Sequence, residues 1–88
     1  MSKELDKLME ILKHNVFIAE VTLVLMSNTK LTVLLDRLSG STVLVTIWRD
    51  KKKLTSKYIP VDKVYSYVEQ LATNLKPVEI KIRDLTRY

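Results

Sequence analysis

The stretch Ser41 to Pro60, STVLVTIWRDKKKLTSKYIP, predicts two β-strands joined by a strongly basic turn. In its first part apolar side chains occupy every second position, at Val43, Val45 and Ile47. A period of two is typical of a strand with at least one packed face. After the turn, the chain returns through residues 54 to 59 and stops at a proline, which cannot donate to a sheet ladder. We therefore predict a hairpin with a charged tip.

Positive charge is concentrated in the same hairpin. The 88 residues carry a net charge of +5, and residues 49 to 63 hold six basic and two acidic groups, a net of +4. Neighbouring charges add within about 8 to 10 Å, so a local excess attracts polyanions. We predict DNA or RNA as the partner, held through phosphate contacts without readout of sequence. The predicted contact residues are Trp48, Arg49, Lys51, Lys52, Lys53, Lys57 and Tyr58, whose two aromatic rings can stack on exposed bases.

The same residues have alternative interpretations. Lysines on an exposed strand also keep a sheet edge soluble. Tryptophan is usually well buried, which favours packing of Trp48 under the N-terminal helix, whereas an exposed Trp48 beside cations would form a contact surface. The segment KKLTSKYI lacks the glycines and the phenylalanine pair of the RNP1 motif. An RNA-binding role therefore depends on charge and on single aromatic residues.

Residues 2 to 15 predict an amphipathic helix that Ser2 caps and Asn15 ends. Its apolar stripe consists of Leu5, Leu8, Met9, Leu12 and Val16, with Ile11 beside it. The stripe either belongs to the core or forms an interface, for which we name Leu5, Leu8, Met9 and Leu12. As the alternative to nucleic-acid binding, we therefore consider a protein interaction module, either a homodimer or a small subunit of a larger assembly.

Three further elements follow from periodicity. Residues 17 to 26 alternate as a strand, and residues 61 to 74 form a second amphipathic helix that begins after Pro60. Beyond Pro77, apolar residues alternate with charged ones in a last strand that has one wet face. Lys81 and Arg83 lie on that face, and this strand is a second candidate interface because sheet edges can pair across a two-fold axis.

The segment Asn28 to Gly40 is ambiguous. As a helix, it places Leu31, Leu34, Leu35 and Leu38 in one stripe, with Ser27 or Asn28 as the cap at the start and Gly40 at the end. As a strand, it alternates Leu31, Val33 and Leu35 with polar residues. The residues at the two ends favour the helix, and the strand is the alternative.

These elements predict one α+β domain, residues 1 to 88, with a single antiparallel sheet and helices on one face. With a helix at residues 28 to 40, the order after the first helix is β-α-β-β-α-β, as in ferredoxin-like domains. That topology would place the polar strand 54 to 59 in the middle of the sheet. With a strand there, the order becomes helix, four-stranded meander, helix, strand.

Composition excludes several kinds of chemistry. The chain has no cysteine, one histidine (His14) and one glycine (Gly40). These counts exclude thiolate metal sites, a histidine-based metal site or catalytic triad within one chain, and a glycine-rich phosphate loop. We predict no enzymatic activity, no cofactor or metal, and no small-molecule substrate. Without a signal peptide or a membrane-spanning run, the sequence predicts a soluble cytoplasmic protein, and its few glutamines and asparagines favour a thermophilic source.

Overall fold

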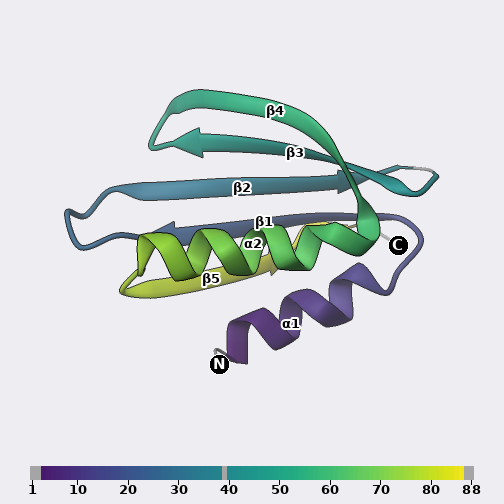
Figure 1. The fold of residues 1–88 in the computed structure, drawn as a ribbon, viewed down its shortest axis with the longest axis horizontal. Helices are drawn as coiled ribbons and strands as arrows, with labels where there is room; N and C mark the ends of the chain where they lie inside the picture. The colour runs from purple at the N-terminus through teal and green to yellow at the C-terminus, as the bar shows by residue number, and fades with distance from the viewer. Residues whose placement is uncertain (1–2, 39, 87–88) are drawn as a thin grey trace.

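The computed structural model describes residues 3–38 and 40–86, in which five strands form one antiparallel sheet and two helices cover one of its faces (Figure 1). In chain order, the elements are α1 (Lys3–Leu12), β1 (Phe17–Val24), β2 (Lys30–Arg37), β3 (Thr42–Arg49), β4 (Lys52–Pro60), α2 (Val61–Leu75) and β5 (Glu79–Asp84). None of the described helices is both long enough and apolar enough to cross a membrane. The α+β class and the single antiparallel sheet are as predicted.

The strand order is β4-β3-β2-β1-β5. Strands β1 to β4 are consecutive neighbours, and α2 then carries the chain back across the sheet so that β5 pairs with β1. The meander alternative describes this arrangement. The ferredoxin-like order is not found, and the polar strand β4 lies at an edge, where water can solvate its exposed side chains.

The helix predicted for Asn28 to Gly40 is wrong, because residues 30 to 37 form β2. Alternation decides the outcome: Leu31, Val33 and Leu35 are buried, whereas Leu34 lies on the other face of the sheet. The apparent end signals belong to turns, since Asn28 has φ 66° and Gly40 has φ 73°. Asparagine and glycine tolerate a left-handed backbone, which turns between strands use as readily as helix ends do.

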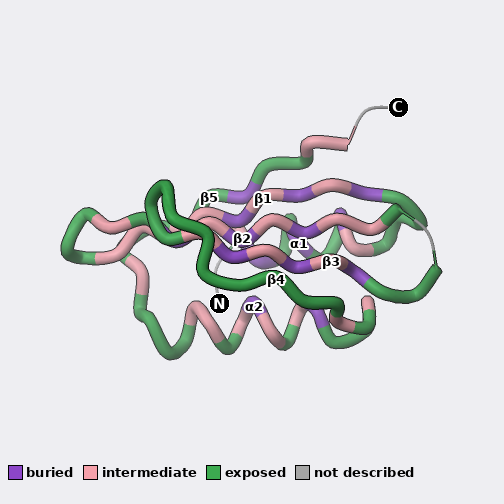
Figure 2. Tube along the Cα trace, turned by 90° about the horizontal axis from the view of Figure 1, so that it is seen from above, coloured by how far each residue is buried: buried purple, intermediate pink, exposed green. Residues whose placement is uncertain are grey.

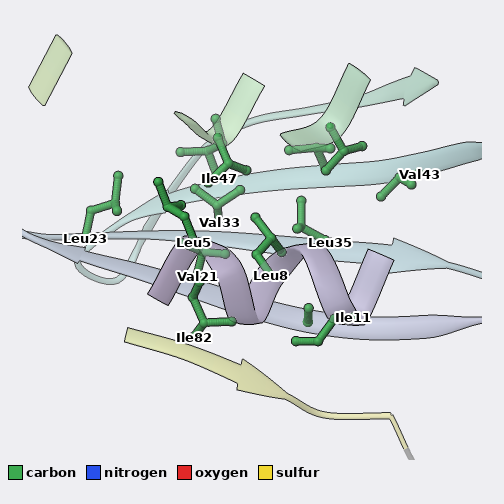
Figure 3. Close-up of a cluster of buried hydrophobic side chains, with 14 of the residues drawn as sticks. Leu5, Leu8, Ile11, Val21, Leu23, Val33, Leu35, Val43, Ile47 and Ile82 are labelled. Carbon is green, nitrogen blue, oxygen red and sulfur yellow. The ribbon is translucent and has the colours of Figure 1, made fainter. Parts of the chain in front are cut away.

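The core lies between the sheet and the two helices (Figure 3). Alternate residues of the strands point into it and meet apolar residues of α1 and α2. The buried core residues are Leu5, Leu8, Ile11, Phe17, Ala19, Val21, Leu23, Leu31, Val33, Leu35, Val43, Val45, Ile47, Val64, Val68 and Ile82. Helix α1 packs against β1 and β5, and α2 packs against β3 and β4. Both helices therefore lie on one side, and the other face of the sheet carries no helix (Figure 2).

Helix α1 contributes Leu5, Leu8 and Ile11 to the core, whereas Met9 is 46% exposed. The buried face of the helix therefore differs from the predicted stripe, because Ile11 is buried and Met9 is not. Leu12 is partly buried against the core. The helix ends at Leu12, before the predicted Asn15, and Ser2 lies outside the described residues. Leu5 and Leu8 are covered within a single chain, so only the outer side of α1 is available to a partner.

Helix α2 and strand β5 follow the predicted pattern. Pro60 occupies the N-cap position of α2, and the left-handed Lys76 ends the helix by donating its backbone N–H to the Ala72 carbonyl at 3.0 Å. Strand β5 buries Ile82 and forms the sheet edge opposite β4. Its exposed face carries Lys81 and Arg83, as predicted.

Candidate nucleic-acid interface

The tip of the β3–β4 hairpin is fastened to the start of β2. Asp50 has φ 54°, and its backbone N–H donates to the Lys30 carbonyl at 2.8 Å. The Asp50 Oδ1 accepts the Lys30 backbone N–H at 3.1 Å. The acidic side chain within the basic turn therefore bonds to the backbone of β2, and the tip is held against the sheet.

All five predicted cations of the hairpin are exposed: Arg49, Lys51, Lys52, Lys53 and Lys57. The ion pairs formed within residues 3–38 and 40–86 are Lys13–Glu10, Lys81–Glu79 and Arg83–Glu20. None of them includes a hairpin cation. In the described part of the chain, the positive charge of the hairpin is therefore not neutralised by a neighbouring carboxylate.

Strand register divides these cations between the two sides of the sheet. Directly opposed residues of paired strands share a face, and Arg49 is opposite Lys52 on the helix side. Lys57 also points to the helix side, where its Nζ lies 4.6 Å from the centre of the Tyr67 ring. Lys51 lies in the turn. Four of the five predicted cations therefore do not lie on the open face.

Trp48, Lys53 and Tyr58 share the open face, with Tyr58 four positions along the strand pair from Trp48 and Lys53. A bulge between Ile47 and Trp48 places Lys53 opposite Trp48, leaving Leu54 as the extra residue. Tyr58 is opposite the half-buried Leu44, and Tyr58 itself is 72% exposed. All three residues lie in the hairpin that the sequence predicts. The bulge puts Lys53 on the same face of the sheet as Trp48 and Tyr58.

The prediction that Trp48 packs under the N-terminal helix is wrong. Trp48 lies on the face away from both helices and is half-buried among its sheet neighbours. Its position follows from alternation, since Ile47 and Arg49 on either side of it point to the helix face. Trp48 is therefore available as part of a contact surface beside Lys53.

Two hollows on the open face were not predicted from the sequence. One, of about 270 Å³, is lined by Asp36, Leu38, Thr42, Leu44 and Tyr58. The other, of about 230 Å³, is lined by Glu20, Thr32, Leu34, Trp48 and Asp50. Each contains one of the two predicted stacking residues beside a carboxylate. Asp36 and Glu20 come from β2 and β1, outside the hairpin, so spacing along the chain gave no signal of them, whereas Asp50 belongs to the hairpin turn itself.

Outside the hairpin, Tyr65 on α2 is a described titratable group with a shifted pKa. Among the residues that the structure describes, no three histidine, cysteine, aspartate or glutamate side chains are grouped to hold a metal ion. Burial, and then the nearby carboxylates Glu69 and Asp6, raise the pKa of Tyr65 on α2 above its usual value. Tyr65 packs against the core on the helix side, away from the open face.

Comparison of the chain with protein-family models, with curated protein sequences and with solved structures found no match. A function for the chain must therefore be inferred from the geometry and charge of the hairpin and of the open face.

Proposed function

We propose that this chain is a non-enzymatic domain that binds nucleic acid through phosphate contacts from the hairpin Arg49 to Lys57. The observation that supports the proposal best is a set of five exposed cations on one hairpin, without a carboxylate partner in the described part of the chain. Contacts of this kind position a nucleic acid but carry no sequence information. Because the cations extend over the tip and both sides of the edge strand β4, they suit a backbone that follows the strand.

The salt dependence of binding tests this proposal. If about four of the cations meet phosphates on duplex DNA, log K should fall against log salt with a slope of roughly −3 to −4, and somewhat less steeply on single strands. Fluorescence anisotropy with single-stranded DNA, duplex DNA and RNA, each at several salt concentrations, measures the slope. Binding that does not change with salt would contradict phosphate contacts, whatever its affinity.

A second candidate function is self-association through β5. The outer edge of this strand is a sheet edge, and its cations are balanced: Arg83 Nη1 lies 3.5 Å from Glu20 Oε1, and Lys81 Nζ lies 4.0 Å from Glu79 Oε1. On β4, by contrast, unbalanced lysines repel a second copy of the strand.

If β5 pairs across a two-fold axis, the protein will have twice the chain mass in solution, and high salt will not dissociate it. Light scattering over a range of protein and salt concentrations measures this mass. A monomer at every concentration would exclude the β5 dimer and leave the nucleic-acid proposal unaffected.

A further inference from the structure

We propose that the hollow between β2, β3 and β4 binds one unpaired base of a single-stranded nucleic acid and prefers guanine. This inference depends on the proposed function and adds a base contact to it. The hollow is the one of about 270 Å³ that Asp36, Leu44 and Tyr58 line with Leu38 and Thr42. The phosphates of the same strand would meet the cations of β4 and the hairpin tip.

The hollow is built on one row of directly opposed residues across the open face. Ile18 on β1 is opposite Asp36 on β2, Asp36 is opposite Leu44 on β3, and Leu44 is opposite Tyr58 on β4. Asp36 therefore lies between two aliphatic side chains, and an exposed aromatic ring stands at the end of the row. The arrangement combines an apolar floor, a ring for stacking and one carboxylate.

The carboxylate of Asp36 is incompletely bonded. Its Oδ1 is inaccessible to water, and no group of the described chain donates a hydrogen bond to it. A buried polar atom without a partner is uncommon in folded proteins and costs free energy. An ionised carboxylate only accepts hydrogen bonds, so the group that would satisfy Asp36 must be a donor.

Guanine offers the best match among the bases. Its N1–H and N2–H are adjacent donors on one edge, and a carboxylate that lacks a donor suits such an edge because charge-assisted hydrogen bonds are strong. The corresponding edges of adenine and cytosine pair one amino donor with an acceptor that would repel Asp36. In a single strand this edge is free, and the base can stack on the Tyr58 ring.

An arginine side chain of a protein partner has similar donors and would also fit Asp36 and Tyr58. Charge decides between the two occupants. The edge strand beside the hollow carries Lys53 on the open face and Lys52 and Lys57 on the helix side, all exposed. These cations repel a basic peptide and attract a polyanion, so the structure favours the nucleic acid.

The experiment compares single-stranded DNA decamers of thymidine in which one central base is thymine, guanine, hypoxanthine, adenine or cytosine. We expect the guanine decamer to bind about 10-fold more tightly than the all-thymine decamer. Hypoxanthine, which lacks only the N2 amino group, should lose part of this gain. Asp36→Asn should remove the guanine preference while the all-thymine decamer still binds, and Tyr58→Ala should weaken binding of the guanine decamer.

Asp6→Asn on α1 is the matched control, because it makes the same change in net charge on an exposed residue of the helix side. It should leave the guanine preference intact. Should Asp36→Asn fail to fold, the comparison of guanine with hypoxanthine on the unchanged protein still tests the contact.

Three results would overturn the inference. Equal affinity for all decamers, or a guanine preference that survives Asp36→Asn, would reject the base pocket and leave the phosphate contacts standing. Tighter binding of an arginine-rich peptide than of the guanine decamer would assign the hollow to a protein partner. Absence of binding to every decamer at low salt would reject the pocket, and absence of binding to duplex DNA and RNA as well would reject the proposed function.

Discussion

Replacing Leu8 by alanine will lower the free energy of unfolding by about 2 to 5 kcal/mol, the range for deleting a fully buried leucine side chain. Leu8 has no exposed surface and lies at the centre of the contact between α1 and the sheet (Figure 3). The substitution leaves a cavity that close-packed neighbours fill only in part. Domains of this kind are stable by about 5 to 15 kcal/mol, so one substitution removes a large share of the total. Urea denaturation followed by circular dichroism measures the change.

Met9→Ala is the matched control on the next position of the same helix. Met9 is 46% exposed, so its truncation should cost well under half as much as that of Leu8. Light scattering of both variants separates a core role from an interface role. If Leu8→Ala changes the mass of the protein in solution and leaves its stability unchanged, the assignment of α1 to the core is wrong.

Changing Lys51, Lys52 and Lys53 together to glutamate will weaken nucleic-acid binding on the order of 100-fold or more at low salt. The triple change lowers the net charge by six, from +5 to −1, and converts the tip from attractive to repulsive for phosphate. It should not unfold the protein, because all three lysines are exposed. Lys52 is also directly opposite Arg49, and opposed like charges destabilise a sheet. The melting temperature should therefore stay the same or rise slightly.

The control for net charge is the triple change of Lys3, Lys7 and Lys63 to glutamate. These lysines are exposed on α1 and α2, and the change produces the same charge of −1. Two of them lie in first helical turns, where glutamate suits the helix dipole. This variant should retain most of the affinity. If both triple variants bind equally weakly, only net charge matters, and if the hairpin variant still binds, the hairpin has no part in the interaction.

Local pattern predicted most of the elements. The alternation of Val43, Val45 and Ile47 predicted β3, and the apolar stripe after Pro60 predicted α2. The returning strand was predicted over residues 54 to 59, whereas β4 begins at Lys52, within the basic run. The predictions of β3 and α2 succeeded because each depends on neighbours within a few residues, where periodicity reports which side faces the core. The concentration of positive charge in the hairpin also follows from composition.

The spacing of apolar residues predicted the wrong element, a helix, at residues 28 to 40. Four leucines there satisfy a helical stripe, yet the segment lies between β1 and β3 and hydrogen-bonds to both. Pairing on both edges gives every second residue a place in the core, which outweighs a weak local preference for helix. The end signals could not resolve the ambiguity, since Asn28 and Gly40 adopt the left-handed backbone that a helix end and a turn both use.

The sequence by itself determined the hairpin, its charge and the alternation of its strands. Only the tertiary structure decided that Lys53 lies beside Trp48 while Lys52 points to the helix side, because one bulge sets that register. Only the strand order placed Asp36 beside Leu44 and Tyr58. Contacts between strands depend on register and on the burial of one face of the whole sheet, and neither is encoded in the spacing of residues along one segment.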